Sequence, residues 1–314
     1  MSDKEIQQNF SFVNSVREST PIRLSLLFGG FFVCLIVNSL IVAMLNGLPG
    51  DERDHLLWGS ILQNLLVFCL PAFLLAKFCS PTPLRWLKLD TKIKLKPIAG
   101  VLIVYLISLP AMDWITEWNS QLTLPEALSG LETTLRMWEE QGNETGQLLI
   151  GSTGVISILV SILVVGIITG FSEELFFRSG VQGILIRSGL GKTGAVWLAA
   201  TIFSALHFQF FGFIPRLLMG VFFGYLLVWS NDVKVSAFAH ILNNSMVIVF
   251  ASIYGAEILT DNNISIYPDV PYLPMVSLIL TAIFLIFCRG YFFKDHKTLT
   301  IPWQKRAVVP PSGN

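Results

Sequence analysis

Charged side chains are scarce in this sequence of 314 residues. They make up 13% of the chain, with 21 Lys and Arg against 21 Asp and Glu, whereas hydrophobic residues make up 53%. Soluble domains carry about 25% charged residues, so the composition excludes an ordinary soluble globular protein. The net charge of zero offers no basic surface for nucleic acid, and no nucleic-acid partner is expected.

The sequence also lacks a disulfide framework and a cleavable leader. Its four cysteines form no CxxC pair and no regular framework; they are Cys34, Cys69, Cys79 and Cys288. Cys34 and Cys69 lie inside apolar runs, where a packed thiol is the simplest interpretation, and no disulfide is expected. A polar stretch, 1–23, precedes the first apolar run, and no small-residue cleavage site follows a short apolar core. We therefore expect a retained first membrane helix.

Long apolar runs, by contrast, are abundant. A run of roughly 20 residues spans the hydrocarbon core of a bilayer. Eight membrane helices are predicted, at 24–46, 57–77, 97–116, 148–187, 193–211, 216–230, 235–254 and 272–289. The fourth is too long for a single perpendicular crossing, so it tilts or extends beyond the bilayer. The expected fold is all-α, with an N-terminal tail (1–23), a polytopic membrane domain (24–289) and a C-terminal tail (290–314) whose segment 302–314 is expected to be disordered.

Lysine and arginine are distributed unevenly between the predicted loops. With eight crossings, one side collects Lys4, Arg17, Arg23, Lys77, Arg85, Lys88, Lys92, Lys94, Lys96, Arg187, Lys192, Lys234, Arg289, Lys294, Lys297, Lys305 and Arg306. The other side has few basic residues and many glutamates. The positive-inside rule therefore predicts that both termini are cytoplasmic, at the plasma membrane if the source is a bacterium. On the acidic side, the stretch 117–147 fits either an amphipathic surface helix or a loop with a helical turn or two.

The interior of the predicted span 148–187 contains three ionisable residues, Glu173, Glu174 and Arg178. Each charge inside a membrane span costs at least about 2.5–3.5 kcal/mol, so such residues are usually functional. Glu174 and Arg178 are four residues apart and share a helical face, which favours a structural ion pair. Glu173 is turned by about 100° from its neighbour, because an α-helix has 3.6 residues per turn. We therefore expect Glu173 not to pair with Arg178 and to have another role.

Two further spans carry polar residues at helical spacing. Phe203 precedes His207 by one turn, and His240 and Asn244 share one face of a later span. Taken singly, an intramembrane His or Asn is most often a partner in an interhelical hydrogen bond. Here, however, an uncompensated glutamate occurs together with two histidines and an asparagine, on three helices. This combination favours a catalytic role over a purely structural one.

These three motifs, in this order, resemble the CPBP family of CAAX proteases and bacteriocin-processing enzymes, also called Abi. The family pattern is Glu-Glu-x-x-x-Arg, then Phe-x-x-x-His, then His-x-x-x-Asn, and the resemblance covers about residues 165–250. It implies an intramembrane, glutamate-dependent endopeptidase that cleaves a membrane-associated protein or peptide, as in CAAX-type processing. The roles it implies are a general base for Glu173, a water-holding group for His207, oxyanion stabilisers for His240 and Asn244, and support for Glu174, Arg178 and Phe203.

The resemblance leaves the metal question open. The family is named as a metallopeptidase, and Glu173, His207 and His240 form a candidate zinc set with one open position. However, the sequence has no His-Glu-x-x-His motif, and asparagine is an uncommon zinc ligand.

Three other functions fit parts of the sequence. Gly170 and Ser172 fit a loose Gly-x-Ser pattern of rhomboid-type serine peptidases, but that mechanism gives the glutamate pair no role. A proton-coupled transporter would use the same glutamates and histidines as a relay, although no inverted repeat supports it. A non-catalytic scaffold or immunity protein with the same fold is the third, and the intact set of polar residues argues against it.

The depths of the motifs impose a condition on the fold. Glu173 lies 14 residues from Arg187, whereas His240 lies only six residues from Lys234. These separations correspond to ~21 Å and ~9 Å at the helical rise of 1.5 Å per residue. The two side chains can meet only if the helix of His240 tilts or the helix of Glu173 extends into the cytoplasm, and we expect the extension.

Overall fold

The computed structural model describes residues 16, 19–92, 95–150, 154–259, 267 and 270–293. These residues form helices joined by short turns, and none of them forms a strand, which confirms the all-α prediction. The predicted tails lie largely outside the described residues, and the segment 302–314 lies wholly outside them.

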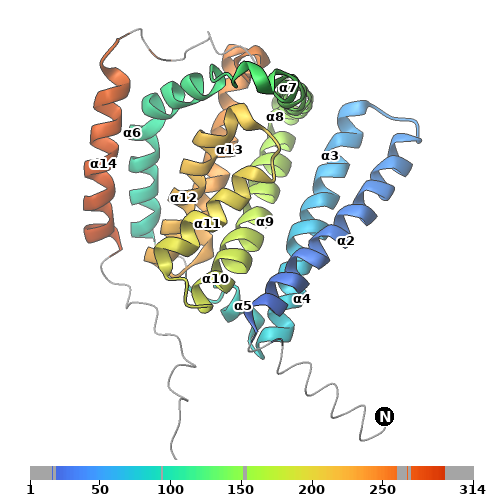
Figure 1. Ribbon diagram of the computed structural model, residues 1–314, viewed down its shortest axis with the longest axis vertical. Helices are drawn as coiled ribbons and strands as arrows, with labels where there is room; N and C mark the ends of the chain where they lie inside the picture. The colour runs from blue at the N-terminus through green and yellow to red at the C-terminus, as the bar shows by residue number, and fades with distance from the viewer. Residues whose placement is uncertain are drawn as a thin grey trace, which may run out of the picture.

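The helices are numbered in chain order (Figure 1). The α-helices are α2 (Thr20–Asn46), α3 (Glu52–Gln63), α4 (Leu70–Cys79), α5 (Pro83–Trp86), α6 (Leu95–Ser120), α7 (Ser129–Ile150), α8 (Val155–Ser161), α9 (Gly170–Glu174), α10 (Gly183–Arg187), α11 (Lys192–Ala205), α12 (Phe213–Ser230), α13 (Val233–Tyr254) and α14 (Leu273–Phe292). Three π-helical segments are η1 (Asn64–Cys69), η3 (Ile162–Thr169) and η4 (Leu175–Gln182). The 3₁₀ turns are η2 (Glu126–Leu128), η5 (Phe210–Gly212) and η6 (Ala256–Leu259).

Seven of the described helices are long and apolar enough to cross a membrane, so the protein is a multi-pass integral membrane protein. Two of them contain π-helical turns: Glu52–Cys79 combines α3, η1 and α4, and Val155–Arg187 runs from α8 through η3, α9 and η4 to α10. The predicted span 193–211 corresponds to α11, whose 14 residues are fewer than the roughly 20 that a perpendicular crossing needs. The predicted span 148–187 starts later than expected, because residues 148–150 belong to α7.

The helix α2 begins and the helix α14 ends at the same end of the bundle (Figure 1). Two basic residues of the predicted cytoplasmic set, Arg187 and Lys234, bond the loop 86–92. Here Arg187 donates from Nη2 to the carbonyl oxygen of Trp86 at 3.0 Å. Lys234 donates from Nζ to the carbonyl oxygen of Leu89 at 3.1 Å. We call this end, defined by the loop 86–92 and the helix termini around it, the basic end.

The acidic stretch after α6 forms a helix of 22 residues, α7, so the helical interpretation of 117–147 is confirmed over most of its length. In Figure 1, α7 is seen almost end-on and lies across the end of the bundle opposite the basic end. Its Glu132 accepts a hydrogen bond from the backbone N–H of Leu124, and this bond, with Arg136, lowers the pKa of the carboxyl group. Glu139 accepts from the backbone N–H of Phe211 at 3.0 Å, while burial raises its pKa. The turn after α11 is thereby tied to α7.

Close backbone contact fixes the helix of Glu173 against α13. A Cβ added at Gly170 would lie 3.0 Å from the backbone nitrogen of Ile241, and one at Gly166 would lie 2.6 Å from Oγ of Ser245. Small residues four positions apart allow helices to approach this closely. The contact brings α9, with both glutamates, beside the middle of α13.

Candidate active site

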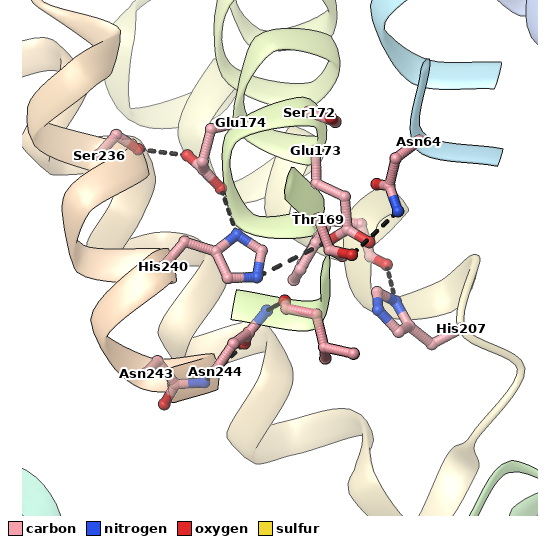
Figure 2. Close-up of polar contacts among 12 residues, drawn as sticks. Asn64, Thr169, Ser172, Glu173, Glu174, His207, Ser236, His240, Asn243 and Asn244 are labelled. Carbon is pink, nitrogen blue, oxygen red and sulfur yellow. Dashed lines mark hydrogen bonds and ion pairs between the residues drawn. The ribbon is translucent and has the colours of Figure 1, made fainter. Parts of the chain in front are cut away.

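The three sequence motifs meet at the contact of α9, α11 and α13 (Figure 2). Glu173 and Glu174 lie on α9, His207 in the turn that follows α11, and His240 on α13. Glu174 is completely buried, while Glu173 and His240 are 8% and 5% exposed. The site is therefore shielded from its surroundings.

Glu174 is held by three polar side chains. The expected ion pair with Arg178 is present, with Nε of Arg178 3.2 Å from Oε2 of Glu174 and both side chains fully buried. Ser236 donates a hydrogen bond to the same oxygen, and the other oxygen, Oε1, lies 3.1 Å from Nδ1 of His240. The guanidinium of Arg178 also lies over the ring of Phe203, 4.9 Å from its centre. Both carboxylate oxygens of Glu174 are thus occupied by these three side chains.

His240 lies between the two neighbouring glutamates. Its Nδ1 faces Glu174, and its Nε2 lies 3.7 Å from Oε2 of Glu173, beyond hydrogen-bond length. The imidazole stacks on Phe223 with 4.9 Å between ring centres. Glu174 thus holds one nitrogen and leaves the other facing Glu173.

The π-helical segments η3 and η4 flank the five residues of α9. Their backbone hydrogen bonds span five residues, and such turns occur often at functional sites because they change which side chains share a face. Glu173 was expected to point away from its neighbour, but both carboxylates approach the same imidazole ring. The uniform spacing of 3.6 residues assumed from the sequence does not hold on either side of α9.

His207 is fixed through one ring nitrogen. Nδ1 lies 2.8 Å from the carbonyl oxygen of Phe203, and because a carbonyl only accepts, Nδ1 carries the hydrogen. In the neutral ring, Nε2 then has a free lone pair. The ring of Phe203 lies 4.9 Å from the ring of His207 and 5.8 Å from that of His240, so it separates the two histidines.

Asn244 is one turn beyond His240 on α13. Its Nδ2 donates to the carbonyl oxygen of Val165 in η3 at 3.1 Å, and its Oδ1 accepts from Asn243 at 3.3 Å. An amide nitrogen has two hydrogens, so one donor of Asn244 remains for a further acceptor.

The sequence motifs missed two groups beside the site. Ser236 was not singled out, although it precedes His240 by four residues on the same face of α13 and so carried a detectable signal. Asn64, in η1, donates to Oγ1 of Thr169 at 2.9 Å and is 2% exposed. The only feature of the sequence that pointed to Asn64 was its position as a polar residue within an apolar run.

The depth condition is met through the extension of the long helix. Ser179 donates to the carbonyl oxygen of Leu87, and Lys234 donates to that of Leu89, so both lie at the level of one loop. Glu173 is six residues from Ser179, and His240 is six residues from Lys234. Both side chains therefore lie ~9 Å from that level at 1.5 Å per residue. The helix of Glu173 continues for eight residues past Ser179, to Arg187, whose side chain bonds the same loop at Trp86.

Glu173, His207 and His240 are the candidate zinc ligands. A catalytic zinc takes three protein ligands at roughly 2.0–2.2 Å. In the described part of the chain, no three His, Cys, Asp or Glu side chains are placed to hold one metal ion. The arrangement of Glu173, His207 and His240 in the structure does not fit a three-ligand zinc site.

Comparison with known proteins gives one match. Residues 155–246 match a family model described as Rce1-like, type II CAAX prenyl endopeptidase. No curated protein and no solved structure matches the chain significantly. The matched segment contains all three motifs, from Glu173 to Asn244, and confirms the resemblance to the CPBP family. The segment 155–246 of this membrane protein is therefore similar to the Rce1-like family of type II CAAX prenyl endopeptidases.

Proposed function

We propose that the protein is an intramembrane endopeptidase in which Glu173 activates water to hydrolyse a peptide bond of a membrane-associated protein or peptide. The observation that supports this most directly is the imidazole of His240 between two glutamates with different surroundings. Glu174 is occupied by Arg178 and Ser236, whereas Glu173 has neither partner. Only Glu173 is then available to accept a proton from water.

The proposed reaction begins with attack of water on the scissile carbonyl. Glu173 takes one proton of the water as its oxygen bonds to the carbonyl carbon, and the carbonyl oxygen becomes an oxyanion. Nε2 of His207, with its free lone pair, accepts the other hydrogen of the water and orients it. Collapse of the tetrahedral intermediate breaks the C–N bond, and the proton held by Glu173 passes to the leaving amine.

The oxyanion needs donors that are already in place. Donors aimed at the developing charge often supply the largest part of catalysis, and loss of one costs about 10²–10³ in rate. His240, when protonated at both nitrogens, donates from Nε2 while Glu174 accepts from Nδ1 at 3.1 Å. The free N–H of Asn244 is the second donor in this proposal.

The test is cleavage of a reporter peptide by the purified protein in proteoliposomes. Glu173→Gln is compared with Glu140→Gln, a matched change on the exposed face of α7. We expect cleavage to be lost only with Glu173→Gln. Equal cleavage by both variants would contradict the proposal, and proton flux abolished by Glu173→Gln without any cleavage would indicate a transporter.

A further inference from the structure

The helix α7 packs against the turn that joins α11 to α12 and carries His207. Residues 129–150 of α7 lie outside the segment 155–246 that matches the family model. We propose that α7 is a positioning element of the candidate site, and that Glu139 is the residue through which it fixes this turn and the ring of His207. The effect on cleavage rests on the proposed peptidase function, but the effect on the turn can be measured without cleavage.

The turn of His207 is not held by regular secondary structure. The helix α11 ends at Ala205, and the backbone N–H of His207 bonds the carbonyl oxygen of Ser204 at 3.3 Å. The next residue, Phe208, has φ of 54°, in the left-handed region that a bulky side chain disfavours. A residue keeps such a conformation only where the surrounding structure imposes it. The shape of the turn therefore depends on contacts from outside it.

Two hydrogen bonds join α7 to the turn. Oε2 of Glu139 accepts the backbone N–H of Phe211 at 3.0 Å. One turn further along α7, Oδ1 of Asn143 accepts from Nε2 of Gln209 at 3.4 Å. These bonds reach the turn at two and four residues beyond His207. The helix α7 thus holds the chain immediately after the histidine.

The side chains around these bonds are packed closely. The rings of Trp138 and Phe208 meet edge to face, with 6.1 Å between their centres. A Cβ added at Gly142 would lie 2.6 Å from Nε2 of Gln209, so α7 approaches this side chain as closely as a glycine allows. From α12, Nη2 of Arg216 donates to Oε1 of Gln209 at 2.9 Å. The turn is therefore held between α7 and α12.

Glu139 makes the contact that matters most for the backbone of the turn. Its partner is the N–H of Phe211, a residue that is 4% exposed, and a buried backbone N–H without an acceptor is costly. The bond of Asn143 is longer and joins two side chains, so its loss should disturb the turn less.

The ring of His207 follows the backbone of this turn. Its Nδ1 bonds the carbonyl oxygen of Phe203 at 2.8 Å, so the position of Nε2 is set by the chain that carries the ring. A misplacement of about 1 Å can lower a reaction rate by about 10²-fold. Loss of the bond of Glu139 should therefore move Nε2 away from the water that it is proposed to orient, while Glu173 stays in place on α9.

The experiment uses the full chain in proteoliposomes and three variants. Glu139→Ala removes the acceptor of Phe211, and Glu139→Gln keeps an acceptor oxygen without the charge. Glu140→Ala is the matched control, because it makes the same change at the next residue of α7, which is exposed. Each variant is measured for amide hydrogen exchange of the segment 206–212 by mass spectrometry, and for kcat and KM of reporter cleavage.

We expect hydrogen exchange within 206–212 to be about tenfold faster in Glu139→Ala, because local opening of the turn becomes easier. The kcat should fall by about 10–100-fold with little change in KM, since the reporter peptide still binds. Glu139→Gln should restore exchange and kcat toward the values of the unchanged protein, and Glu140→Ala should match that protein.

Unchanged exchange in Glu139→Ala would overturn the proposal, and so would faster exchange with an unchanged kcat. Equal losses in Glu139→Ala and Glu139→Gln would overturn the role of the hydrogen bond. If the unchanged protein cleaves no reporter, the proposed peptidase function fails, and hydrogen exchange alone decides whether α7 fixes the turn. If Glu139→Ala does not accumulate, Asn143→Ala takes its place, with exchange expected to be about threefold faster and no increase contradicting the proposal.

Discussion

Glu174 and His240 are joined by a contact of 3.1 Å between Oε1 and Nδ1. Through it, the carboxylate that pairs with Arg178 also sets the direction of the imidazole that faces Glu173. The two glutamates of the Glu-Glu motif therefore differ in partners, and a set of substitutions can test whether they also differ in function.

The paired glutamine variants test this division. Glu173→Gln keeps the size of the side chain and removes proton acceptance, so turnover should fall by about 10²–10⁴-fold while thermal stability in detergent is retained. Glu174→Gln should lower the free energy of unfolding by about 3–5 kcal/mol, because it leaves Arg178 buried without its counter-charge. Turnover and thermal stability in detergent are both measured for each variant. A stable, inactive Glu174→Gln beside an active Glu173→Gln would show that the roles are reversed.

Ser236→Ala should weaken the support of Glu174. The hydroxyl lies against the buried carboxylate, and loss of a donor to a buried acceptor costs about 1–3 kcal/mol. We expect a lower melting temperature and a lower kcat with little change in KM, since His240 would be less firmly oriented. Ser252→Ala is the matched control, because that serine donates only to the carbonyl oxygen of Val249 in its own helix. Equal effects of the two variants would remove Ser236 from the site.

Gly170→Ala should separate α9 from α13. The added methyl group would meet the backbone of Ile241 at 3.0 Å, and backbone cannot move aside as a side chain can. Overpacking of this kind costs typically about 1–3 kcal/mol, and activity should fall with it because Glu173 and His240 would move apart. Gly146→Ala, on α7, has no atom within 4 Å of its added Cβ and should be neutral or stabilising by up to ~1 kcal/mol. The measurements are thermal melting and reporter cleavage of both variants. Equal stability and equal activity of the two would contradict the close contact of α9 with α13.

Ser172→Ala should retain most activity. The hydroxyl of Ser172 donates to the carbonyl oxygen of Ile168 at 2.7 Å and accepts from the thiol of Cys69, so its contacts are structural. A serine nucleophile would instead be bonded to a histidine base. Reporter cleavage by the alanine variant at normal expression is the measurement, and loss of cleavage would favour the rhomboid-type mechanism.

The sequence predicted the parts of the site that depend on regular spacing. The pair of Glu174 and Arg178 and the shared face of His240 and Asn244 follow from i, i+4 geometry on a helix. The contact of Glu174 with the imidazole ring that also faces Glu173 could not be predicted, because it accompanies π-helical turns that no residue pattern announces. The shortness of α11 was missed for a different reason: apolar residues continue past Ala205, where the backbone turns at Phe208 with φ of 54°.

The uneven burial of the helix Val155–Arg187 has a consequence for how the protein is made. Its C-terminal half carries Glu173, Glu174, Arg178 and Gln182, which are poorly tolerated by lipid but are buried against α11, α12 and α13 in the finished bundle. Those three helices are synthesised later. We therefore expect the polar half of the long helix to be shielded from lipid, and the site to form, only after α13 has been synthesised.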